Sequence, residues 1–123
     1  MEIKAISAKL EDDGYCTVLA FADDAIEPRR YVILQVTNNP SPQDMQLGQG
    51  GVHFELGRQK LSGYDLVKAI QTTDSGVLLT IEENAARKAG IDTHLAIELV
   101  GTSMDAGSAE EAIKIFKARL SRD

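Results

Sequence analysis

Two short β-type runs joined by a tight-turn signal most constrain what this chain can fold into. Residues 3–10 and 15–22 are rich in apolar and strand-forming side chains, and Glu11-Asp12-Asp13-Gly14 lies between them. The Asp-Gly pair favours the positive φ values of a tight hairpin, so the two runs are predicted to pair as antiparallel strands. Both alternating faces of the second run are largely apolar, which indicates a strand at the centre of a sheet.

Further strand signals follow along the chain. The asparagines and prolines of residues 38–42 end the third run, because proline removes a backbone donor and asparagine favours turns. A surface loop is expected from there to about Gly51. Residues 66–70 also fit helical spacing, but Gly63 and the strand-forming neighbours favour a strand. The strands predicted after the first hairpin are 31–37, 52–56, 61–64, 66–72, 77–81 and 94–100.

Two helices are predicted. Residues 82–89 are rich in helix formers and end at Gly90, which readily adopts the left-handed conformation of a C-terminal cap. Ser108 and Glu111 have the spacing of a capping box at the start of a C-terminal helix. The apolar face of that helix comprises Ala109, Ala112, Ile113, Phe116 and Leu120. The predicted fold class is α+β: a mainly antiparallel β-sheet of about seven to eight strands, with a short helix near 82–89 and a C-terminal amphipathic helix packed on the sheet.

Length and composition indicate one soluble domain. A chain of 123 residues fits a single domain spanning 1–123, large enough for a real core. The one cysteine, Cys16, cannot form an intramolecular disulfide and is predicted to act as a small buried hydrophobe. The first residues lack the apolar region of a signal peptide, and no run approaches the ~20 apolar residues of a membrane span. A cytoplasmic protein with no membrane partner is expected.

The charge balance bears on the partners. The formal net charge is −6 and the sequence pI is about 4.9, so the average field repels phosphates and disfavours direct binding to nucleic acid. Acidity of this size is what a soluble domain needs in any case. It also steers a basic protein partner toward the surface.

The sequence shows no recognisable catalytic set. His53 and His94 fall in different predicted strands, and neither has a His or Cys nearby at metal-ligand spacing. A nucleophile pair of Cys16 with either histidine would need an exposed and activated thiol. No catalytic residue, metal or cofactor is therefore predicted, and the chain is not expected to be an enzyme.

An acidic turn precedes the third strand. Asp23, Asp24 and Glu27 are close enough in sequence to bind a cation or to act as an acid–base pair. Their spacing matches no calcium-loop pattern, and Arg29 and Arg30 place positive charge beside them. A hydrated turn is the more general interpretation of such a cluster.

Polar-tipped side chains mark a second set. Tyr31 and Gln35 project from the same face of the third strand, with Ile33 between them. Together with Tyr64 they form either a buried hydrogen-bonded set or part of a binding face, because tyrosine is common in both settings.

A series of short pieces in the middle third of the chain occurs in a recognisable order and spacing. The pieces are Phe21-Ala22-Asp23-Asp24, Glu27-Pro28, Tyr31-Val32-Ile33-Leu34-Gln35, Asp44, Leu47-Gly48, Gly51-Val52-His53-Phe54-Glu55 and Ser62-Gly63-Tyr64. Together they resemble immunity protein family 10 of bacterial polymorphic toxin systems, whose members are small cytoplasmic proteins that shield the producing cell from a matching toxin. Aspartate and leucine follow the Ser-Gly-Tyr piece, where the family pattern leads us to expect glycines.

The resemblance implies a non-catalytic protein that binds and neutralises a cognate toxin, for instance a nuclease with a basic surface. The implied partner-binding residues are Asp23, Asp24 and Glu27 in the acidic turn and Asp44 in the long loop, because loops carry recognition more often than cores do. Two alternatives stay open. One is a small-ligand or enzymatic domain with a pocket near Tyr31, Gln35 and His53. The other is a homo-oligomer joined through an exposed strand edge.

Overall fold

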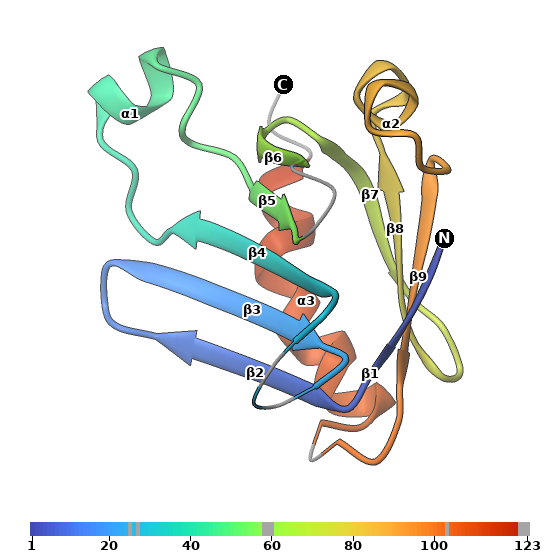
Figure 1. Cartoon of the computed structure of the whole chain (residues 1–123). Helices are drawn as coiled ribbons and strands as arrows, with labels where there is room; N and C mark the ends of the chain where they lie inside the picture. The colour runs from blue at the N-terminus through green and yellow to red at the C-terminus, as the bar shows by residue number, and fades with distance from the viewer. Residues whose placement is uncertain (25, 27, 58–60, 103, 121–123) are drawn as a thin grey trace.

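The computed structural model describes the chain except for residues 25, 27, 58–60, 103 and 121–123. The described residues form an α+β fold of two sheets and three helices, which confirms the predicted class (Figure 1). In this part of the chain, no helix has both the length and the apolar character needed to cross a membrane. In chain order the elements are β1 (Glu2–Ala5), β2 (Ser7–Asp12), β3 (Cys16–Ala22), β4 (Tyr31–Thr37), α1 (Pro42–Gln46), β5 (His53–Leu56), β6 (Leu61–Tyr64), β7 (Val67–Thr72), β8 (Gly76–Ile81), α2 (Glu83–Ala89), β9 (His94–Leu99) and α3 (Ala106–Leu120).

The strands form one five-stranded and one four-stranded sheet. The five-stranded sheet has the order β2-β3-β4-β5-β6, and every neighbouring pair in it is antiparallel. The four-stranded sheet has the order β1-β9-β8-β7, in which only the β1–β9 pair is parallel. The first predicted hairpin is confirmed, with Gly14 at a φ of 91° in its turn. The strand interpretation of residues 66–72 is also confirmed, because β7 pairs with β8.

The run predicted as one strand over residues 3–10 is divided between the two sheets. Ile3 and Ala5 of β1 point into the core, whereas the next inward side chain is Ala8 of β2, so the alternation shifts by one residue. Ile6 lies at the shift with 48% of its surface exposed, and its N–H donates to the Ala22 carbonyl at 3.0 Å. With this division the described residues form nine strands, where the sequence predicted about seven to eight.

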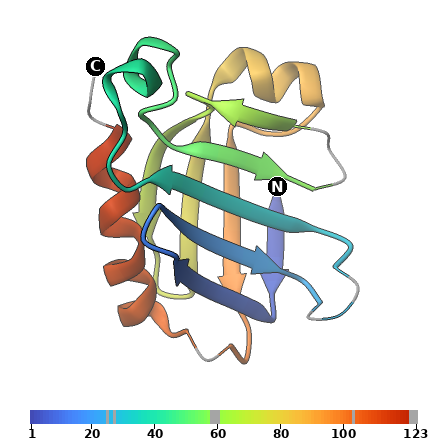
Figure 2. The same cartoon turned by 90° about the vertical axis from the view of Figure 1, so that its left-hand side faces the viewer.

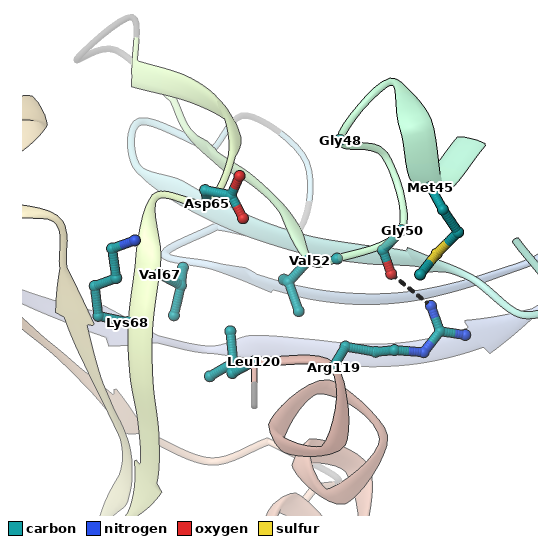
Figure 3. A pocket seen from close by; sticks show the side chains of 10 residues that line it. Met45, Gly48, Gly50, Val52, Asp65, Val67, Lys68, Arg119 and Leu120 are labelled. Carbon is teal, nitrogen blue, oxygen red and sulfur yellow. Dashed lines mark hydrogen bonds between the residues drawn. The ribbon is translucent and has the colours of Figure 1, made fainter. Parts of the chain in front are cut away.

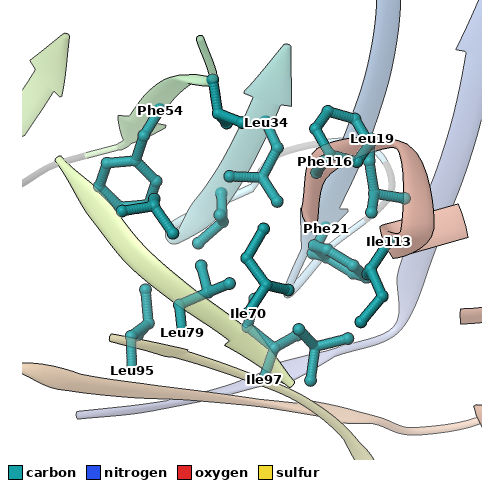
Figure 4. Close-up of a cluster of buried hydrophobic side chains, with 14 of the residues drawn as sticks. Leu19, Phe21, Leu34, Phe54, Ile70, Leu79, Leu95, Ile97, Ile113 and Phe116 are labelled. Atoms are coloured by element: carbon teal, nitrogen blue, oxygen red, sulfur yellow. The ribbon is translucent and has the colours of Figure 1, made fainter. Parts of the chain in front are cut away.

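The core lies between the two sheets, and α3 closes one side of the space between them (Figure 2). Inward side chains of both sheets meet there, among them Leu19 and Phe21 from β3 and Leu79 from β8 (Figure 4). Phe116 and Ile113 of α3 complete the cluster, at 0% and 1% exposure. The predicted apolar face of the C-terminal helix is therefore confirmed.

Helix α2 follows the prediction closely. The Glu82 carboxylate accepts the backbone N–H groups of Asn84 and Ala85 at 3.0 and 2.7 Å, which caps the first turn. Gly90 ends the helix in the left-handed region with a φ of 71°.

The start of α3 differs from the prediction. The helix begins at Ala106, and the carboxylate that caps it belongs to Asp105, which accepts the Ser108 N–H at 2.7 Å. Glu111 instead pairs with Lys114 at 2.7 Å. The proposed Ser108–Glu111 capping box was therefore wrong, because an acidic residue three positions earlier takes the capping role.

Helix α1 was not predicted, since the loop after residue 38 was taken as irregular. Ser41 accepts the Asp44 N–H at 3.1 Å, and the Asp44 carboxylate accepts the Ser41 N–H at 2.9 Å. This reciprocal pair is a capping box, and Pro42 at the first helical position has the φ that a helix needs. The sequence Ser41-Pro42-Gln43-Asp44 contains both signals of a helix start, the capping box and the proline at the first helical position.

Candidate functional site

The acidic turn between β3 and β4 is organised by its own carboxylates. Asp23 is half-buried and accepts the N–H groups of Arg29 and Arg30 at 2.9 and 3.1 Å. Asp24 is exposed and accepts the Ile26 N–H at 2.8 Å. Glu27 lies outside the described residues. Asp23 therefore shapes the connection into β4, in addition to any role at the surface.

Asp44 lies at the other end of the same strand. It belongs to α1, which follows the end of β4, whereas the acidic turn precedes the start of β4 (Figure 1). Seven residues of extended strand separate the two, which corresponds to roughly 20 Å. The structure therefore does not bring Asp44 together with Asp23 and Asp24.

Tyr31, Gln35 and Tyr64 all belong to the outward face of the five-stranded sheet. Tyr31 and Gln35 alternate along β4 with the buried residues, and each is half-buried. Gln35 pairs with His53 across β4–β5, and His53 pairs with Tyr64 across β5–β6. The His53 and Tyr64 rings meet edge to face, with centroids 5.0 Å apart at 75°. His53 thus links Gln35 to Tyr64 in one row across the sheet.

Tyr31 is held in place by two neighbours. The neighbouring Glu55 carboxylate raises the pKa of Tyr31, because it interacts favourably with the protonated hydroxyl and its negative charge opposes loss of the proton. Its ring lies over Gly57, where an added Cβ would sit 2.1 Å from the Tyr31 Cε1 atom. Only glycine leaves room for the ring in this position.

We call this surface the open face: the outward side chains of β3, β4, β5 and β6. No helix lies in front of β3 and β4 in Figure 2. The sequence contains no lysine or arginine between residues 31 and 57, so β4 and β5 contribute carboxylate, amide, aromatic and apolar groups to it. Its members are Cys16, Val18, Ala20, Ala22, Tyr31, Ile33, Gln35, Thr37, His53, Glu55, Ser62 and Tyr64.

The groups considered for chemistry are spread over the fold. Cys16 is half-buried on the open face, not in the core as predicted, because its strand alternates and Thr17, Leu19 and Phe21 take the inward positions. Strand β4 separates Cys16 from His53, and His94 is on the other sheet. Among the described residues, no three His, Cys, Asp or Glu side chains come together in a way that would hold a metal ion.

A cavity of about 310 Å³ opens elsewhere, between α1, β7 and the end of α3 (Figure 3). Met45, Asp65, Lys68 and Arg119 are among its lining residues. Arg119 has a structural role there, because its guanidinium donates hydrogen bonds to the backbone carbonyls of Gly50, Thr37 and Asn38. Tyr31, Gln35 and His53, the residues of the predicted alternative pocket, do not line this cavity.

Sequence reasoning missed Glu55 in the set around Tyr31, and it grouped His53 with Tyr31 and Gln35 only as the lining of an alternative pocket. The alternation of residues 52–56 put both on one strand face, but their link to Tyr31 and Tyr64 depends on β5 lying between β4 and β6. The order of the strands in the sheet determines this link, and the local sequence pattern does not reveal that order.

Fold and surface together describe a small α+β domain with an extended, solvent-facing sheet surface. The chain belongs to the immunity protein 10 family, whose model matches residues 2–107. The match extends well beyond the middle third in which the resemblance was first seen, and it ends at the start of α3. A comparison with curated proteins finds no match. Membership in an immunity protein family supports a toxin-neutralising role in general terms.

Proposed function

We propose that this chain is a non-catalytic inhibitor that acts in the cytoplasm and neutralises a cognate toxin domain, such as a nuclease, by covering it with the open face. The observation that carries the proposal is the family match over residues 2–107, combined with a sheet surface on which no described helix lies in front of β3 and β4 in Figure 2. Inhibition of this kind is stoichiometric, because one bound inhibitor blocks one toxin molecule.

The composition of the open face supports protein binding. Tyrosine is enriched in interfaces, since its ring supplies contact area at low entropic cost and its hydroxyl finds polar partners. Tyr31 is already positioned by Glu55 and Gly57, and Tyr64 by His53. Side chains ordered before binding lose less freedom when a partner docks, so these two tyrosines are suited to be anchors.

The acidic residues have a separate part in the proposal. Asp23 and Asp24 lie in the connection before β4 and Asp44 lies in α1 after it, so carboxylates lie near both ends of the central strand. The proposal includes Glu27 on the sequence alone, and Arg29 and Arg30 offset part of the negative charge of the acidic turn. Charge of this sign accelerates encounter with a basic toxin surface, and the effect weakens with salt. Asp23 and Asp24 both accept backbone N–H groups of this turn, so a test of their charge must also establish that the variant folds.

A charge placed at the centre of the open face tests the proposal. Ile33 is half-buried there, between Ala20 and Glu55 on the neighbouring strands. Ile33→Arg should abolish protection against the cognate toxin domain, because a large positively charged side chain at the centre of the contact blocks close docking and repels a basic toxin surface. Leu78→Arg is the matched control, since Leu78 is a half-buried apolar residue on the outward side of β8 in the other sheet.

Circular dichroism and the unfolding midpoint establish that both variants fold. The proposal predicts loss of toxin binding for Ile33→Arg and near-normal binding for Leu78→Arg. Equal binding by the two folded variants would exclude the open face as the contact surface.

A further inference from the structure

Tyr15, at the tip of the β2–β3 hairpin, is an exposed aromatic residue that neither the core nor the open face explains. Its side chain is 80% exposed, although tyrosine carries a large apolar ring. Tyr31 and Tyr64, by contrast, are half-buried and contact neighbouring side chains. Folding gains little from the Tyr15 ring, so its position is available for an external contact.

The backbone of Tyr15 is fixed from both sides. Its N–H donates to the Asp13 carboxylate at 2.8 Å, and its carbonyl accepts the Asn38 N–H at 2.8 Å. Asn38 also donates its side-chain amide to Asp12 at 2.9 Å and accepts the Thr17 hydroxyl at 2.6 Å. The tip therefore presents an exposed ring on an ordered backbone, which lowers the entropic cost of using that ring in binding.

A second apolar side chain is exposed at the same end of the five-stranded sheet. Leu47, at the C-terminal end of α1, is 63% exposed. Helix α1 follows the C-terminal end of β4, and Asn38 at that end is hydrogen-bonded to Tyr15 in the tip. Helix α1 and the tip therefore lie at the same end of the five-stranded sheet (Figures 1 and 2). This end of the sheet therefore presents two exposed apolar side chains that are available for contact with another protein.

The charge around the tip indicates what kind of surface would meet it. Glu11 and Asp12 end β2 next to the tip, Asp13 lies in the turn and Asp44 lies in α1, whereas residues 10–28 and 31–57 contain no lysine or arginine. Arg119, which approaches this end from α3, donates to backbone carbonyls. An aromatic ring surrounded by carboxylates is complementary to a concave protein surface lined with cations.

We propose that Tyr15 inserts into a concave, cationic pocket of the toxin domain and forms a second contact beside the open face. The inference rests on the proposed function and adds to it the anchor residue and the chemistry of the partner pocket. Removal of the ring should mainly raise the dissociation rate, whereas removal of nearby charge should mainly lower the association rate.

The test measures binding of the purified cognate toxin domain to the full chain and to two pairs of variants. Tyr15→Ala removes the anchor, and Ile115→Ala removes an exposed apolar side chain on α3 as its control. Glu11→Lys reverses a charge next to the tip, and Glu110→Lys makes the same change at an exposed position of α3. The ring of Tyr15 is exposed, so Tyr15→Ala should leave the unfolding midpoint unchanged.

Tyr15→Ala should weaken binding by about tenfold or more, which is the loss typical of an anchor residue. Ile115→Ala should leave the binding affinity unchanged. Glu11→Lys should slow association and flatten its dependence on salt, and Glu110→Lys should do neither. If the unaltered chain binds the toxin domain and Tyr15→Ala binds equally well, the tip is not a contact and the proposed function stands. If the unaltered chain does not bind, the proposed function itself fails.

Discussion

The end of α3 is tied to the five-stranded sheet by one side chain, and its removal gives a prediction with a calculable size. Arg119 donates to the Thr37 carbonyl at 2.6 Å, to the Asn38 carbonyl at 2.8 Å and to the Gly50 carbonyl at 2.9 Å. These bonds join the last turn of the helix to the end of β4 and to the segment between α1 and β5. Arg119→Ala removes all three at once.

The expected loss follows from the number and kind of bonds. A hydrogen bond from a charged group contributes about 1.5–3 kcal/mol net, so three at the lower end contribute about 4.5 kcal/mol. The lower end applies because Arg119 is only part-buried and water reaches the site. The freed side chain recovers rotamer entropy of up to about 2 kcal/mol, which leaves a net destabilisation of about 2.5 kcal/mol.

Urea denaturation of Arg119→Ala measures this quantity as a change in midpoint at constant slope. Lys117→Ala is the control, because it removes the same charge from an exposed position on the same helix and should change the free energy of unfolding by less than about 0.5 kcal/mol. Arg119→Lys keeps the charge but not the planar fork, so it should lie between the two. Equal stabilities of Arg119→Ala and Lys117→Ala would refute the assigned role.

Two further predictions concern α3. Phe116→Ala should destabilise the protein by about 3–5 kcal/mol, because the ring is 0% exposed between the sheets; a loss below about 1 kcal/mol in calorimetry or urea denaturation would show that α3 is not part of the core. The bond from the Ser108 N–H lowers the pKa of Asp105 from its ordinary value of 3.8, so the charged carboxylate stabilises the fold above that value and the contribution is lost as the pH falls through the lowered pKa. Asp105→Asn should therefore be less stable than the unaltered chain at neutral pH and should approach its stability in acid, and a difference that does not change with pH would contradict this assignment.

Local patterns predicted most of the elements because their signals were short-range. Asp-Gly between two alternating runs specified the first hairpin, and Gly90 specified the end of α2. The capping box of Ser41 and Asp44 was equally readable but was obscured by the prolines around it. The shift of alternation between Ala5 and Ala8, which sends β1 and β2 to different sheets, was also present in the sequence.

The candidate site was less predictable, because it depends on which strands lie side by side. Tyr31 and Gln35 were placed on one face by alternation alone, but the link through His53 to Tyr64 requires the order β4-β5-β6. The exposure of Tyr15 was hidden as well, since the strand pattern placed it inside β3, whereas that strand begins at Cys16. Long-range pairing determines both results, and a local pattern carries little information about it.

Titration of the toxin domain's activity with the purified chain tests the central claim most directly. Occlusion by a bound inhibitor predicts that activity falls linearly and reaches zero at one chain per toxin molecule, with both proteins recovered intact as a complex. Loss of toxin activity at a small fraction of one equivalent, with the toxin chemically altered, would contradict the account, because it would show that the chain acts by turnover.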